Sequence, residues 1–180
     1  FRKLNPYSRS KSPKKRHLAI ELWKKIIVAC LPAAMLGLLI DDWVEEHLLN
    51  GFVIAMALII YGVLFIMIEN SNKKRQYSIK NVYAIGYQTA LWIGFFQVLA
   101  LIPGTSRSGA TIIGGMILGA SRSVSAEFSF FLSIPIMFGA SFLKLIKFGL
   151  HYTVAEVVYL LLGMIVSFVV SVISINFLLS

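Results

Sequence analysis

The sequence predicts an all-α polytopic membrane protein, a transmembrane helix bundle that contains a re-entrant helix-loop-helix hairpin. Three observations lead to this fold class. Hydrophobic residues make up 58% of the 180 residues, and charged residues only 14%. The apolar residues form long runs, and most basic residues lie in short stretches beside them. One polar loop interrupts an apolar region, and irregular backbone is stable at membrane depth only where protein or a polar cavity surrounds it.

The first two spans are predicted at residues 26–40 and 51–69. A helix needs ~20 apolar residues to cross ~30 Å of hydrocarbon, and both regions approach that length with the help of their flanks. Trp23 and Trp43 are suited to the membrane interfaces. Residues 1–25 hold nine of the 17 Lys and Arg residues and are predicted to form a basic cytoplasmic flank.

The charges beside the spans predict the orientation. The acidic loop 41–50 is expected outside and the basic loop 70–81 inside. The net charge of +9 could also indicate nucleic-acid binding. No aromatic residues interleave with the basic runs, however, so a nucleic-acid partner is not expected. Four carboxylates in the acidic loop could hold a hard cation, but a solvated loop is the preferred interpretation: Asp41, Asp42, Glu45 and Glu46.

Residues 82–120 are predicted to form the re-entrant hairpin. The apolar segment 112–120, which leaves the polar loop, reaches only ~14 Å at 1.5 Å per residue, under half the bilayer. Arg122 follows almost at once. The alternative is two ordinary spans with a polar surface loop between them, which requires the second helix to continue across Arg122. Further spans are predicted at 124–143 and 154–180.

The polar loop PGTSRSGAT, residues 103–111, is the most informative stretch of the chain. Pro103 lacks an N–H and is expected to end the incoming helix. Gly104 and Gly109 are expected to allow positive φ and a close approach of the backbone to a ligand. The next helix is expected to begin near Ala110, where its dipole and free amides would favour an anion.

Arg107 is the centre of this predicted anion site, because a guanidinium stays charged and can hold a phosphate bidentately. Four hydroxyl side chains accompany it: Thr105, Ser106, Ser108 and Thr111. Gln97, on the incoming helix, is expected to hydrogen-bond across the bundle or to touch the bound head group. The alternative is a capped kink in which Arg107 pairs with a carboxylate. An arginine at membrane depth is costly, so the functional interpretation is preferred.

Residues 91–140 resemble the second signature region of the undecaprenyl-diphosphate phosphatase family, the bacitracin-resistance membrane phosphatases. The resemblance rests on PGTSRSGAT and the following AEFSFFLSIP, and it extends over residues 18–180. It implies a multi-pass protein of the bacterial inner membrane built from inverted repeats, with one half and part of the other in this chain. The implied activity is hydrolysis of undecaprenyl diphosphate to undecaprenyl phosphate, which recycles the lipid carrier of peptidoglycan synthesis.

The resemblance also implies roles for individual residues. Arg107 would neutralise the diphosphate and Ser106 would donate to a phosphate oxygen, although Ser106 has no base in the motif and is a weaker candidate for the nucleophile. Substrate-binding roles fall on the other residues of the site: Gly104, Thr105, Ser108, Gly109, Thr111 and Gln97. The implied partners are the polyprenyl diphosphate and membrane lipids, and a homo-oligomer stays open.

The family's N-terminal signature of paired glutamates, serines, a threonine, a glycine and a histidine has no counterpart in this sequence. The nucleophile and the ligands of a divalent cation, Mg²⁺ or Ca²⁺, are therefore expected outside this chain. Whether the chain is active by itself stays open, and an inactive half of the enzyme is one interpretation. The competing interpretation is a transporter or flippase that binds the lipid phosphate without hydrolysis, since re-entrant hairpins are common in transporters.

Overall fold

The computed structural model describes residues 13–72, 77–148 and 153–179. In these ranges the chain forms six α-helices and two 3₁₀ turns but no strand, which confirms the predicted all-α class. The chain divides into two compact units, residues 1–138 and 139–180. Residues 1–12 of the predicted basic flank and the predicted loop residues Lys73, Lys74 and Arg75 lie outside the described residues.

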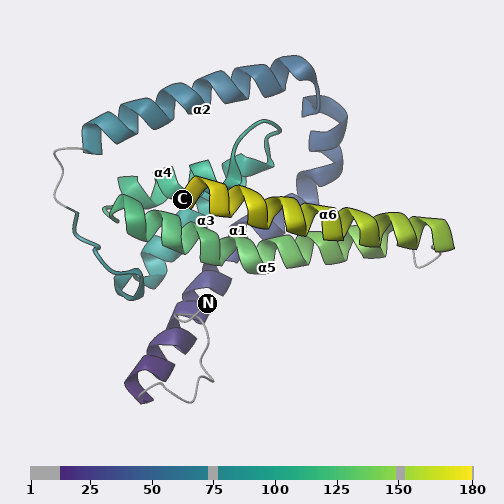
Figure 1. The fold of residues 1–180 in the computed structure, drawn as a ribbon. Helices are drawn as coiled ribbons and strands as arrows, with labels where there is room; N and C mark the ends of the chain where they lie inside the picture. The colour runs from purple at the N-terminus through teal and green to yellow at the C-terminus, as the bar shows by residue number, and fades with distance from the viewer. Residues whose placement is uncertain (1–12, 73–76, 149–152, 180) are drawn as a thin grey trace. The chain divides into compact units, whose positions relative to one another are not determined.

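Four helices are long: α1 (Pro13–Leu48), α2 (Gly51–Asn72), α5 (Arg122–Phe148) and α6 (Val154–Leu179) (Figure 1). Each of them contains a stretch long and apolar enough to cross a membrane. The shorter elements fall between α2 and α5: η1 (Val82–Ala84), α3 (Tyr87–Val98), η2 (Leu99–Leu101) and α4 (Arg107–Ile117). The chain is therefore polytopic, with a separate pair of short helices in its middle.

Helix α1 continues past the apolar stretch 26–40 in both directions. The acidic residues expected in a loop at 41–50 lie instead on its last turns, so that expectation is wrong. Residues such as Glu form helices readily although they are not apolar. A hydropathy pattern therefore underestimates the length of a helix that continues beyond its apolar stretch. The chain turns only at Leu49 and Asn50, where the Asn50 side chain accepts a hydrogen bond of 3.0 Å from the Val53 amide and caps α2.

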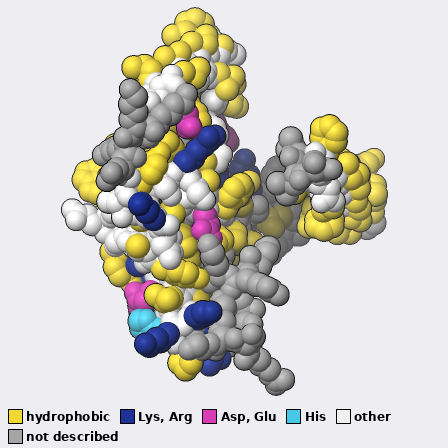
Figure 2. All heavy atoms as spheres, turned by 60° about the vertical axis from the view of Figure 1, so that its left-hand side comes forward, with side chains coloured by type: hydrophobic (Ala, Val, Ile, Leu, Met, Phe, Trp, Pro, Cys, Tyr) yellow, Lys and Arg dark blue, Asp and Glu magenta, His cyan; other side chains and the backbone are white. Residues whose placement is uncertain are grey.

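In the first unit, α3 packs against α1 along one stripe of its surface. The stripe has helical spacing and comprises Ala90, Ile93, Gly94 and Gln97, all buried. Gly94 allows the close approach, since a Cβ atom there would lie 3.1 Å from the Ala29 Cα of α1. By contrast, hydrophobic side chains are exposed over much of the face in Figure 2, and residues 155–177 of α6 are exposed throughout.

The two ends of the segment 82–120 meet. The amides of Ser78 and Ile79 both donate to the Gly119 carbonyl at 3.1 Å, and the Ser121 amide donates to the Ile79 carbonyl at 3.0 Å. Gly119 makes this possible with a positive φ of 92°, a conformation that glycine adopts without strain. A re-entrant hairpin needs an entry and an exit on the same side, and this pairing supplies that geometry. The depth of the hairpin in a membrane stays a prediction.

Candidate functional site

The polar loop is held at a sharp turn between α3 and α4. Ile102 is extended (φ −71°, ψ 124°), as expected for a residue before proline, and it ends the helical path of α3 and η2. Gly104 has a φ of 92°, which confirms its expected positive φ. A Cβ atom on Gly104 would lie 2.7 Å from the Ile54 carbonyl oxygen of α2. The Thr105 hydroxyl lies 2.8 Å from the carbonyl oxygens of Leu99 and Ile102, so it stabilises the turn itself.

Helix α4 begins at Arg107, three residues earlier than expected. Ser106 is its N-cap, and the Ser106 Oγ accepts a hydrogen bond of 3.2 Å from the Gly109 amide. Gly109 is therefore helical, and the expectation of a positive φ at this residue is wrong. The physical reason is that the Ser106 side chain caps the free amide of the residue three positions on. This N-cap starts the helix, and Gly109 can adopt helical backbone angles like any other residue. The Ser108 Oγ lies 3.2 Å from that of Ser106, and both serines are exposed.

Arg107 is half-exposed at the start of α4, and its Nη1 lies 3.3 Å from the Met137 sulfur of α5. A thioether is a weak acceptor and carries no charge. In the part of the chain that the structure describes, no carboxylate forms an ion pair with Arg107, which argues against the capped-kink alternative. The first amides of a helix have no intrahelical partner, so those of Arg107 and Ser108 are oriented toward the same end of α4.

Thr111 is placed differently from the other hydroxyl residues of the loop. It is buried, with 2% of its surface exposed. Its Oγ1 lies 3.0 Å from the Arg107 carbonyl, 3.1 Å from the Ser108 carbonyl and 2.6 Å from the Ser129 Oγ of α5. The Thr111 hydroxyl thus faces α5 and the first turn of α4, whereas those of Ser106 and Ser108 are exposed.

Ser129 was not singled out by the sequence analysis. The available signal was the spacing of Ser125, Ser129 and Ser133, because residues four apart share one face of a helix. Two of them contact α4, since Ser129 meets Thr111 and a Cβ atom on Gly115 would lie 2.6 Å from the Ser125 Oγ.

Gln97 lies on the buried stripe of α3 that faces α1, with 2% of its surface exposed. Neither side-chain polar atom has a hydrogen-bond partner within the described ranges. No hydrogen bond of the described residues joins it to the hydroxyls of the loop.

The residues described by the structure offer no metal site of their own. No group of three or more His, Cys, Asp or Glu side chains among them could hold a metal ion. The divalent cation that the resemblance implies therefore stays a prediction.

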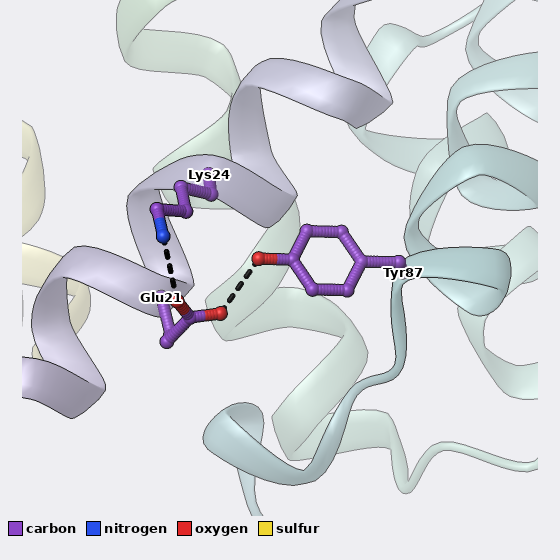
Figure 3. Close-up of polar contacts among 3 residues, drawn as sticks. All are labelled: Glu21, Lys24 and Tyr87. Atoms are coloured by element: carbon purple, nitrogen blue, oxygen red, sulfur yellow. Dashed lines mark hydrogen bonds and ion pairs between the residues drawn. The ribbon is translucent and has the colours of Figure 1, made fainter.

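A second polar cluster fixes the start of α3 to α1 (Figure 3). The Tyr87 hydroxyl donates to the Glu21 carboxylate at 2.6 Å, and Lys24 donates to the other oxygen of that carboxylate at 2.9 Å. Lys25 donates to the Tyr83 carbonyl at 2.9 Å and lies 5.9 Å from the centre of the Tyr87 ring. These contacts secure the helix that leads into the loop.

Comparison with known families matches residues 2–180 to the family described as bacitracin resistance protein BacA. The chain belongs to this family. The match begins sixteen residues before the resemblance noted from the motifs and includes the whole loop 103–111. Together with the four apolar helices, membership of the BacA family makes the chain part of a multi-pass protein of the bacterial inner membrane.

Curated relatives named undecaprenyl-diphosphatase are similar over most of this chain. The relative from Desulfitobacterium hafniense is 53% identical over 179 residues, which cover 99% of this chain and 64% of the relative. One from Enterococcus faecalis is 57% identical over 159 residues, or 88% and 58% of the two chains. One from Streptococcus thermophilus is 47% identical over 183 residues, or 100% and 64%. The chain thus spans less than two thirds of the length of each of these BacA-family relatives.

Proposed function

We propose that this BacA-family protein is an undecaprenyl-diphosphatase, a hydrolase that converts undecaprenyl diphosphate to undecaprenyl phosphate and inorganic phosphate. This activity would return the lipid carrier to peptidoglycan synthesis. The names of the relatives support the proposal. The observation that carries it is the Arg107 guanidinium, which stands at the first turn of α4 with a neutral thioether as its contact.

The loop residues supply the groups that a diphosphate requires. In this proposal Arg107 binds the terminal phosphate and offsets the charge that develops on its oxygens during hydrolysis. The amides of Arg107 and Ser108 add donors at the helix N-terminus. The Ser106 oxygen accepts from the Gly109 amide and lies 3.2 Å from the Ser108 oxygen, so in this proposal one of the two hydroxyls donates to the other and the second donates to a phosphate oxygen. Ser108 offers a second exposed hydroxyl.

The proposed reaction breaks one phosphoanhydride bond. The oxygen of a water molecule bonds to the terminal phosphorus, and the bond from that phosphorus to the bridging oxygen breaks. The bridging oxygen leaves on undecaprenyl phosphate, and the proton released by water goes to solvent or to a base. We place that base, and the ligands of a divalent cation such as Mg²⁺ or Ca²⁺, outside the described residues.

Phosphate release from undecaprenyl diphosphate by the full-length protein in detergent tests the proposal. Arg107→Ala is expected to lower kcat/KM by roughly 10³-fold, because it removes the main cation from the transition state. Arg107→Lys should recover part of the loss, since lysine restores charge without the bidentate geometry. Lys144→Ala, which removes an exposed cation of α5, is the matched control and should stay near wild type.

Two results would contradict the proposal. Near-normal turnover by Arg107→Ala would remove the assignment of Arg107. Binding of the lipid through Arg107 by a wild-type protein that never releases phosphate would favour the transporter or flippase.

A further inference from the structure

Two hydroxyl groups and one carbonyl group connect α5 to Arg107. They are the hydroxyls of Ser129 and Thr111 and the Arg107 carbonyl. The Thr111 Oγ1 lies within hydrogen-bond distance of two carbonyl oxygens, those of Arg107 (3.0 Å) and Ser108 (3.1 Å). Carbonyl oxygens only accept, so the single hydroxyl hydrogen of Thr111 is directed to them. The 2.6 Å contact with Ser129 is then a bond in which the Ser129 hydroxyl donates to Thr111. The direction of the chain is Ser129 to Thr111 to the Arg107 carbonyl.

This chain of bonds is shielded from solvent. Thr111 is 2% exposed and Ser129 is 5% exposed. Hydrogen bonds in such surroundings are stronger than in water, and a partner that is removed is not replaced by solvent. The pair is therefore a rigid link between the two helices, in contrast to the exposed hydroxyls of Ser106 and Ser108.

The register of the two helices places Ser129 where it can act on Arg107. Along α4, the residues Gly115, Thr111 and Arg107 meet α5 in that order. Along α5 their partners are Ser125, Ser129 and Met137, so the two helices run antiparallel, as Figure 1 also shows. Thr111 lies one helical turn after Arg107 in α4, so its hydroxyl reaches the Arg107 carbonyl directly.

We propose that Ser129 is a positioning residue for Arg107. It holds the Thr111 hydroxyl and, through it, the first turn of α4, whose amides and guanidinium face the lipid diphosphate. Ser129 touches no substrate in this assignment and acts only through Thr111. The inference rests on the proposed function for the identity of the reaction, but the link between α5 and the first turn of α4 rests on the contacts alone.

The first test compares Ser129→Ala with Ser133→Ala in the full-length protein. Ser133 lies one turn further along α5 and donates to the Phe130 carbonyl of its own helix at 2.8 Å, so it is a matched control. Ser129→Ala is expected to lower kcat roughly tenfold with KM changed less than about twofold, because misplaced groups affect the reacting geometry more than the initial binding. Ser133→Ala should leave both constants unchanged. Equal effects of the two substitutions would overturn the assignment.

The second test is a double-mutant cycle with Thr111→Ala. If Ser129 acts only through Thr111, adding Ser129→Ala to the Thr111→Ala protein should change kcat less than about twofold. Independent, multiplying effects on kcat would show that Ser129 acts by another route and would contradict the proposal.

Hydrogen exchange separates a failure of this inference from a failure of the proposed function. Peptides covering residues 107–117 are expected to exchange at least about fivefold faster in Ser129→Ala than in wild type or Ser133→Ala, whether or not the protein hydrolyses the lipid. If the wild-type protein releases no phosphate but the difference in exchange rate is observed, the proposed phosphatase activity is contradicted and the link between α5 and α4 is supported. Unchanged exchange would remove the link.

Discussion

Helices α4 and α6 show two ways in which a sequence in this family uses apolar residues. Helix α6 has 26 residues, and its described side chains at 155–177 are exposed throughout. Helix α4 has only 11 residues, most of them buried, and it contacts α5 through small or hydroxyl residues. Hydropathy alone identifies α6. The candidate site lies where the hydropathy is interrupted, and there residues such as Thr111 and Gly115 have particular neighbours on α5.

The largest effect on the stability of the fold is expected from a substitution in the loop before α4. Gly104→Ala should destabilise the fold by about 3 kcal/mol, since alanine is strained at a φ of 92° and its Cβ would meet the Ile54 carbonyl oxygen at 2.7 Å. The midpoint of thermal unfolding in detergent measures this change, and activity should fall with it because Arg107 follows the turn directly. An unchanged midpoint would mean that α2 is not held against the loop in the full-length protein.

A pair of glycine substitutions compares the two helices directly. Gly115→Ala in α4 should destabilise the protein by about 2 kcal/mol, because the new Cβ would lie 2.6 Å from the Ser125 Oγ. Gly163→Ala in α6, which has no atom of the described structure within 4 Å of a new Cβ, should stabilise by about 0.5 kcal/mol. Thermal unfolding of the two variants gives the comparison. Destabilisation by Gly163→Ala would instead show that another segment of the protein packs on α6.

The smallest effect is expected from Ser125, one turn before Ser129. Its hydroxyl is buried and has no hydrogen-bond partner among the described residues, so it gains little from being polar. Ser125→Ala should therefore be neutral or stabilising by up to about 1 kcal/mol and should leave kcat unchanged. The same assays on Ser129→Ala should show a loss. A loss of activity in Ser125→Ala would reveal a partner for this hydroxyl, such as a bound water, and would blur the distinction between the two serines.

Much of the architecture could be predicted from sequence because long apolar runs leave few alternatives. Helices α2 and α6 begin at the first residue of the predicted stretches 51–69 and 154–180. Helix α1 was underestimated at both ends, since hydropathy stops at charged residues whereas helical hydrogen bonding does not. Hydropathy averaged over a window of residues measures how readily that segment transfers into lipid. It contains no information on whether the helix continues beyond the apolar segment.

The sequence predicted which residues belong to the candidate site better than it predicted their conformation and contacts. Arg107, the serines and Gly104 are recognisable because their residue types are unusual in an apolar region. The helical state of Gly109 was missed, because it depends on whether Ser106 caps the helix. The spacing of the α5 serines places Ser129 on one face of that helix, but its contact with Thr111 could not be predicted, since it depends on the register between α4 and α5.

The backbone pairing of Ser78 and Ile79 with Gly119 and Ser121 has a consequence for the order of folding. Ser78 and Gly119 are 41 residues apart in the sequence, and the loop that carries Arg107 lies between them. Because synthesis proceeds from the N-terminus, Ser78 emerges from the ribosome long before its partners. Closing a loop of this length costs entropy that only the completed pairing can offset. The Arg107 loop is therefore secured late, after the whole hairpin has been made.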